Sequence, residues 1–210
     1  MLAATKNPER LAEATSVLNE IMATPDKGIP QDLLDRANCV VVVPGLKKGA
    51  FIFGARYGKG YVSCRKKGAK GWSAPATVRV EGGSFGFQIG VTETDVVLLV
   101  MNSRGADSLM QSKFTIGGTA QAAAGPVGRT ATADTDAAMK AEILSYSRAR
   151  GLFAGLALDG ATLRADLDSN KAMYKQRLTT AQIVRDRKVK PTTSGSAFVS
   201  ALTKYSAKEL

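Results

Sequence analysis

Apolar and polar positions alternate most clearly between residues 145 and 160. One set of alternate positions is apolar and the other is mostly small: Leu152, Ala154, Leu156 and Leu158 against Gly151, Phe153, Gly155 and Ala157. A period of two predicts a strand, and glycines inside a strand predict that something packs very close to it. Asp159 and Gly160 form a turn dipeptide before a second strand at 161–164. We therefore expect the central hairpin of an antiparallel sheet here.

Similar patterns predict strands elsewhere in the middle of the chain. A run of valines at 39–43 predicts a buried strand that Pro44 and Gly45 end. Further strands are expected at 50–58, 60–66, 77–81, 84–91, 95–102, 129–134 and 141–147. The phase of the alternation predicts one shared core, formed by Phe51, Phe53, Phe85, Phe87, Ile89, Leu152, Leu156 and Leu158.

Helical spacing predominates at the two ends of the chain. Asn7 is a candidate N-cap and Pro8 suits the first helical position, with apolar residues at three- and four-residue spacing up to Met22. Other helices are expected at 29–36, 103–112, 168–175, 180–185 and 196–206. The fold class is α+β, with a central antiparallel, partly barrel-like sheet and N-terminal and C-terminal helices packed around it. We expect one domain over 1–210, with N-terminal helices at 8–37, a core at 38–175 and a C-terminal helical extension at 176–210.

The residue types exclude most catalytic and metal chemistry. The chain has no histidine, so a Ser-His-Asp triad and histidine zinc sites are excluded. Asp166, Asp168 and Asn170 match the first ligands of a calcium loop, but Lys171 and Arg177 stand where its glycine and closing glutamate belong. The glycine clusters fit neither a phosphate loop nor a dinucleotide fingerprint. We expect no enzyme, no cofactor and no metal.

The two cysteines, Cys39 and Cys64, leave two alternatives open. They are either buried free thiols, which the residues favour, or a disulfide between adjacent strands in an oxidising compartment.

The positive charge is the feature that points to a partner. The net charge is +11, and the 45 residues from Arg36 to Val80 contain ten basic residues and no acidic one. Several lie in expected turns at 46–49 and 65–71, which predicts one positive patch formed by Lys47, Lys48, Arg65, Lys66, Lys67 and Lys70. Such a patch suits anionic lipid headgroups or nucleic acid, and the alternative is surface charge that serves solubility.

Six ordered motifs resemble one known family. Residues 146–160 read Tyr-Ser-Arg-Ala-Arg-Gly-Leu-Phe-Ala-Gly-Leu-Ala-Leu-Asp-Gly, which resembles the signature of the SYLF domain, also called the Ysc84 family. The other matching blocks are Pro44–Phe51, Trp72–Pro75, Gly86–Gly90 with Thr94–Val97, Gly125–Arg129 and Asn170–Tyr174. The resemblance covers the chain from about Leu11 to Tyr174 and is that of a bacterial-type, stand-alone member.

The resemblance implies a lipid-binding domain without catalysis. Eukaryotic members of the family bind phosphoinositides, a yeast member also binds actin filaments, and bacterial members are commonly small exported proteins or lipoproteins. The eukaryotic lipid-binding helix is basic, whereas the first helix here carries Lys6 and Arg10 against Glu9, Glu13 and Glu20. We therefore expect anionic phospholipids as partners, through peripheral membrane association, and actin as an unlikely partner.

Two alternative functions accompany this expectation. The first is binding of nucleic acid or another polyanion through the same charge, although no nucleic-acid motif is present. The second is actin binding, as in the eukaryotic relatives. No apolar run approaches the length of a membrane-spanning helix, so the chain is expected to be soluble, and extracytoplasmic if a signal peptide has been removed.

Overall fold

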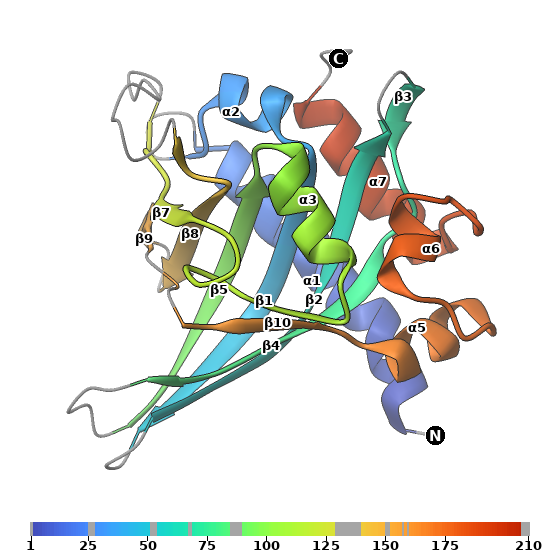
Figure 1. The fold of residues 1–210 in the computed structure, drawn as a ribbon, viewed down its shortest axis with the longest axis horizontal. Helices are drawn as coiled ribbons and strands as arrows, with labels where there is room; N and C mark the ends of the chain where they lie inside the picture. Colours follow the sequence, from blue (N-terminus) through green and yellow to red (C-terminus); the bar gives the residue numbers. More distant parts are fainter. Residues whose placement is uncertain are drawn as a thin grey trace.

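The chain folds into a strongly curled β-sheet with helices on both faces (Figure 1). This computed structural model describes residues 2–24, 28–50, 54–66, 69–84, 90–128, 140–149, 152–156, 158 and 160–206. Its strands are β1 (Cys39–Ala50), β2 (Gly54–Lys66), β3 (Ala69–Trp72), β4 (Ala76–Ser84), β5 (Gly90–Val100), β6 (Lys113–Thr115), β7 (Ala122–Ala124), β8 (Ile143–Ala149), β9 (Leu152–Gly155) and β10 (Thr162–Ala165). Its helices are α1 (Leu2–Met22), α2 (Gln31–Arg36), α3 (Ser103–Met110), α5 (Leu167–Tyr174), α6 (Thr180–Val184) and α7 (Thr193–Tyr205). The predicted α+β class is confirmed.

The sheet has the strand order β6-β10-β4-β2-β1-β5-β8-β7, with β3 paired to β2 and β9 paired to β8. Its pairs are antiparallel except β7 with β8, so the sheet is mixed. It curls into a half-barrel, and the segment between β9 and β10 reaches from one edge to the other. The Leu156 amide donates to the Ser145 carbonyl at 3.0 Å, and the Gly160 amide donates to the Ile116 carbonyl at 2.9 Å.

Each face of the sheet has its own hydrophobic core. Alternate valines of β1 point to opposite faces, so Val41 and Val43 join one core and Val40 and Val42 join the other. We call the face covered by α1, α2 and α7 the outer face, and the face covered by α3 and α6 the inner face (Figure 1). The strands β1, β2, β4 and β5 continue past the helices, which leaves both faces of their far ends uncovered (Figure 1).

Local structure differs from the sequence prediction at the start of the chain and at Pro44. Helix α1 begins at Leu2 and continues through Pro8, so Asn7 is not an N-cap. Asn7 is buried, and its amide donates to the Ser169 carbonyl at 3.3 Å. Strand β1 continues beyond Pro44 through a bulge, where Gly45 adopts a φ of +57°. A bulge lets a strand bend without ending, which hydropathy alone does not indicate.

The predicted central hairpin is wrong. Strand β9 pairs with β8 near one edge of the sheet, whereas β10 pairs with β4 and β6 near the other. Leu152 is 71% exposed, and its neighbour Phe153 instead turns to the outer core and stacks on Tyr146 with 5.3 Å between ring centroids. Leu158 is buried as predicted, and Leu156 is partly buried against the inner core. The other predicted core residues, Phe51, Phe53, Phe85, Phe87 and Ile89, lie outside the described residues.

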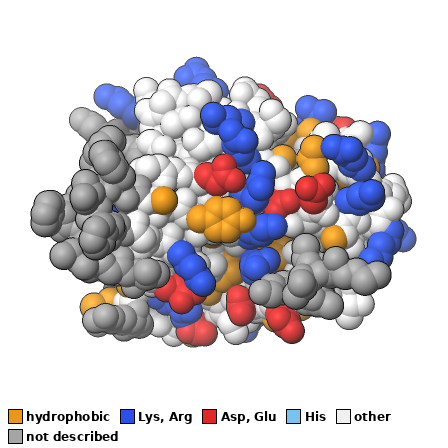
Figure 2. Space-filling model, turned by 90° about the horizontal axis from the view of Figure 1, so that it is seen from below, with side chains coloured by type: hydrophobic (Ala, Val, Ile, Leu, Met, Phe, Trp, Pro, Cys, Tyr) orange, Lys and Arg blue, Asp and Glu red, His pale blue; other side chains and the backbone are white. Residues whose placement is uncertain are grey.

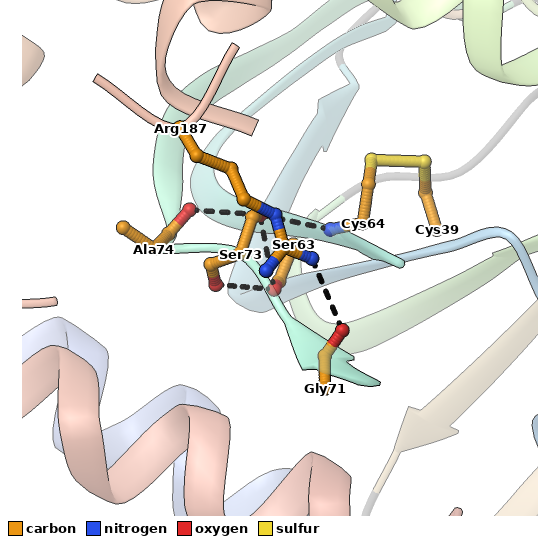
Figure 3. Close-up of a disulfide and its surroundings, with 7 residues drawn as sticks. All are labelled: Cys39, Ser63, Cys64, Gly71, Ser73, Ala74 and Arg187. Atoms are coloured by element: carbon orange, nitrogen blue, oxygen red, sulfur yellow. Dashed lines mark hydrogen bonds between the residues drawn. A yellow bond between two sulfur atoms is a disulfide. The ribbon is translucent and has the colours of Figure 1, made fainter. Parts of the chain in front are cut away.

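The two cysteines form a disulfide. Cys39 and Cys64 are directly opposite each other on β1 and β2, with their Cα atoms 4.0 Å apart (Figure 3). The alternative of two free thiols, which the residues had favoured, is therefore wrong. Beside the bridge, the Cys64 amide donates to the Ser73 hydroxyl at 3.1 Å, which fixes the chain that enters β4 (Figure 3).

Candidate functional site

A row of four basic side chains crosses the outer face of the sheet. Lys59 on β2 is opposite Arg79 on β4, Arg79 is opposite Arg164 on β10, and Arg164 is opposite Lys113 on β6. Neighbouring strands lie about 4.8 Å apart, so the row is about 15 Å long. Like charges placed directly opposite destabilise a sheet, so this row, which we call the basic row, opposes stability and is a candidate site.

Two carboxylates partly compensate the basic row. Glu81 lies between two of its members, 3.6 Å from Arg79 and 3.5 Å from Arg164. Asp166 pairs with Lys59 at 2.7 Å. Four cations against two carboxylates leave the row with an excess of two positive charges. Figure 2, which views the molecule from below, shows Lys and Arg side chains gathered with fewer acidic ones around an apolar group on this face.

Asp166 anchors one end of the row because it does two tasks at once. Its carboxylate caps α5 by accepting from the Ser169 amide at 3.1 Å and also accepts from the Lys59 ammonium. Burial acts to raise the pKa of Asp166, but the hydrogen bonds from Lys59 and Ser169 outweigh it, so the pKa lies below its ordinary value. The carboxylate stays ionised and holds Lys59 in place.

An exposed aromatic residue extends the site toward the uncovered end of the sheet. Tyr57 is 48% exposed on the outer face and is two residues from Lys59 on β2. Its cross-strand neighbours are Lys47 on β1 and Glu81 on β4. Tyrosine has an apolar ring and a polar hydroxyl, which suits the boundary between a membrane and water. The basic row, Tyr57 and Lys47 together form what we call the outer-face site.

The structure does not bring the six predicted basic residues into one patch. Lys47 is exposed on the outer face, and Lys48, the next residue, points to the inner face. Arg65 lies near the opposite end of β2 from Arg56, the residue opposite Lys48. At the rise per residue of a strand, Arg56 and Arg65 are about 30 Å apart. Lys66 and Lys70 are at the turn beside Arg65, where only their backbone is described, and Lys67 lies outside the described residues.

Arg65 has a structural role in this fold. Its guanidinium lies 4.4 Å from the centre of the Trp72 ring and donates to the Ser206 carbonyl at 3.1 Å. Burial lowers the pKa of Arg65, and Asp35 acts in the opposite direction. This arginine therefore joins β2 and β3 to the end of α7.

The sequence prediction missed Arg164 and Lys113 because they lie far from the acid-free span. Each is a polar residue next to a buried apolar one, Leu163 and Phe114 respectively, which marks it as outward-facing on its strand. The alignment of four strands that places them beside Arg79 depends on register. A hydropathy pattern does not give that register between strands distant in sequence.

Within the described ranges, no group of three or more Cys, Asp or Glu side chains is placed to hold a metal ion. The residues of the failed calcium loop have other partners, since Asp166 caps α5 and the Asn170 side chain accepts from the Thr77 amide at 2.7 Å. None of the described helices has the length and apolar character needed to cross a membrane.

Comparison with known proteins identifies the family. The family model described as "Ysc84: Las17-binding protein actin regulator" matches residues 81–205, well over half of the chain. The chain belongs to the Ysc84 family. The resemblance found in the sequence motifs is therefore confirmed. The match includes Glu81 on β4 and Arg164 on β10.

Relatives in the Ysc84 family are longer proteins. The SH3 domain-containing YSC84-like protein 1 of Xenopus laevis is 34% identical over 153 residues, which cover 72% of this chain and 45% of that protein. LAS seventeen-binding protein 3 of Saccharomyces cerevisiae is 30% identical over 186 residues, 87% of this chain and 40% of that protein. Protein YSC84 of the same yeast is 30% identical over 191 residues, which cover 89% of this chain and 40% of that protein. The chain thus spans less than half the length of these relatives.

The Ysc84 family description corrects one expectation. We expected actin to be an unlikely partner, because the first helix is not basic. The description names actin regulation and binding to Las17, which contradicts that expectation. The charge of the first helix alone was not sufficient to make actin an unlikely partner, because the outer face of the sheet carries a basic surface of its own.

Proposed function

We propose that this chain is a non-enzymatic binding domain that associates with anionic phospholipid surfaces through its outer-face site. The basic row carries the proposal, because its four cations lie in register with only two carboxylates beside them and so form a net positive surface. Each Lys or Arg near an anionic membrane contributes about 1 kcal/mol, so the excess charge of the basic row supplies useful, salt-sensitive affinity.

The shape and composition of the site support this proposal. The outer face is convex where the sheet curls, and Tyr57 is exposed beside Lys47 at its uncovered end. A tyrosine ring inserts at the headgroup level of a membrane while its hydroxyl stays hydrated. The basic turn with Lys66, Lys67 and Lys70 stays a predicted second contact at the far end of β2.

A second candidate function is binding to actin or to an actin-regulating protein. It is favoured by the family description and by the names of the yeast relatives. A basic surface also complements an acidic protein surface, and electrostatic complementarity of this kind sets specificity and association rate. The same outer-face site would serve such a partner.

Sedimentation with vesicles and with actin filaments tests these functions. We expect the protein to pellet with phosphatidylcholine vesicles that contain phosphatidylserine and not with pure phosphatidylcholine, and binding should weaken steeply as salt is raised. Pelleting with neutral and anionic vesicles alike would contradict the electrostatic proposal. Pelleting with actin filaments alone would favour the second function, and preferential, salt-sensitive binding of single-stranded nucleic acid would favour a general polyanion binder.

A further inference from the structure

A cavity of about 570 Å³ lies on the inner face of the sheet, on the side opposite the outer-face site. It lies where β1, β2 and β5 continue past the helices, and the end of β8 and the segment after β9 close it. Its volume falls within the range of small-molecule sites, about 300–1,000 Å³.

The floor of the cavity is apolar. Leu46 and Leu158 are buried in the inner core, and Val96 and Leu156 complete the apolar lining. The cavity is therefore an extension of the inner core toward solvent, with room beside the side chains of that core. Such a floor favours an aliphatic chain, because each methylene that leaves water adds to binding.

The mouth of the cavity is cationic and rich in hydroxyl groups. Lys48 on β1 and Arg56 on β2 are directly opposite each other and both line the cavity. Thr92, Thr94 and Ser147 add hydroxyl donors around them. An anionic group at the mouth would accept charge-assisted hydrogen bonds from these two cations.

One carboxylate, that of Glu93, also borders the cavity. By strand alternation Glu93 belongs to the outer face, because its neighbours Thr92 and Thr94 line the inner one. Its carboxylate oxygen lies 2.5 Å from the position of a Cβ on Gly45, a residue that lines the hollow on the outer face instead. The acidic group is therefore directed away from Lys48 and Arg56.

We propose that this cavity binds one molecule of a long-chain fatty acid anion, with the carboxylate between Lys48 and Arg56 and the chain along Leu46, Val96, Leu156 and Leu158. An apolar floor and a paired cationic mouth match the two parts of this amphiphile. The site goes beyond binding to a membrane surface, since it takes a single molecule from solution and uses the opposite face of the sheet.

Calorimetry with dodecanoate tests the proposal at concentrations below its micelle formation. We expect one dodecanoate per protein, at least about tenfold weaker binding of dodecanol because it lacks the charge, and no measurable binding of butyrate because it lacks the chain. Equal affinity for dodecanoate and dodecanol would contradict the proposal that Lys48 and Arg56 bind the carboxylate. Absence of dodecanoate binding, or uptake of many molecules per protein, would overturn the site.

Variants locate the ligand and separate this proposal from vesicle binding. Lys48→Gln with Arg56→Gln should weaken dodecanoate binding at least about tenfold, whereas Lys47→Gln, the neighbour on the outer face, should leave it unchanged. Ser147→Phe, which fills the cavity without touching the charges, should abolish it while the circular dichroism spectrum and melting temperature are retained. Wild-type affinity in Ser147→Phe would contradict the location. Binding to anionic vesicles should survive Ser147→Phe, so failure of either proposal is recognised without the other.

Discussion

Asp166 is the residue on which the geometry of the basic row depends most. Its side chain is 5% exposed, caps α5 and pairs with Lys59. Asp166→Ala removes both interactions and should lower the free energy of unfolding by about 2–3 kcal/mol, whereas Asp166→Asn keeps the cap and should cost about half as much. Urea unfolding at neutral pH measures both. No cost for Asp166→Asn would show that the ion pair with Lys59 contributes nothing, and equal costs for the two variants would show that the cap contributes nothing.

The pH dependence of stability follows from the lowered pKa of Asp166. A carboxylate whose folded-state pKa lies below its ordinary value of 3.8 stabilises the fold fully above that value, and the contribution is lost as pH falls through the folded pKa. The difference in unfolding free energy between wild type and Asp166→Asn should therefore be constant above about pH 5 and shrink below pH 4. A difference that grows on acidification would mean that the pKa is raised.

Gly155 shows that the sequence pattern was correct about close packing. A Cβ at this position would lie 2.4 Å from the Gly125 carbonyl oxygen, a backbone atom that has little freedom to move. Gly155→Ala should cost about 1–3 kcal/mol of stability. Gly49→Ala is the matched control, because nothing lies within 4 Å of a Cβ there, and it should be neutral or slightly stabilising. Equal thermal shifts for the two variants would contradict the packing around Gly155.

At the scale of single residues, the sequence predicted close packing of the backbone better than it predicted which side chains are buried. Gly155 correctly predicted close approach, and the buried Leu158 was also predicted. Leu152 was expected in the core but is 71% exposed, because β9 lies at the margin of the sheet and the residue of this strand that reaches a core is the aromatic Phe153. The alternation itself holds along β9, but a period of two does not show which of its two faces is covered.

At the scale of elements, the disulfide ties together the two strands at the centre of the sheet. Cys39 and Cys64 are 25 residues apart in sequence, and closing a loop of that length stabilises a fold by about 3 kcal/mol in the chain-entropy account. The double variant Cys39→Ala with Cys64→Ala should therefore unfold at a lower urea concentration than protein purified under oxidising conditions. Titration of two free thiols in that wild-type protein, or an unchanged midpoint, would contradict the bridge.

Helices were predicted more reliably than strand partners. Three of the expected helices correspond closely to observed ones: 168–175 to α5 (Leu167–Tyr174), 180–185 to α6 (Thr180–Val184) and 196–206 to α7 (Thr193–Tyr205). Caps such as Asp166 and Thr179 are local signals that a sequence displays directly. The pairing of β10 with β4 and β6 instead of β9 joins residues far apart along the chain, and no local signal specifies it.

Considered as a whole, the part of the molecule that the structure describes has uncovered surfaces on both faces of one curled sheet. Neither the basic row nor the inner cavity was foreseen as a unit from the sequence, although Lys47 and Lys48 were both predicted as lipid contacts. The prediction assumed that these lysines lie in a turn. The bulge at Gly45 instead carries β1 onward, so consecutive lysines point to opposite faces.

The most direct test of the outer-face site compares two variants that lose the same charge. Lys113→Gln with Arg164→Gln removes two members of the basic row and leaves Arg79 to pair with Glu81. Lys188→Gln with Lys190→Gln removes two exposed lysines from the segment between α6 and α7. Each variant lowers the net charge of +11 by two.

Partitioning of these two variants onto phosphatidylserine-containing vesicles, measured by sedimentation at fixed salt, decides the central claim. Loss of two headgroup contacts should cost about 2 kcal/mol, so the basic-row variant should bind about 30-fold more weakly than wild type. The control variant should bind within about threefold of wild type, because its lysines lie away from the site. Equal weakening of both variants would show that binding follows net charge alone and would contradict a site on the outer face.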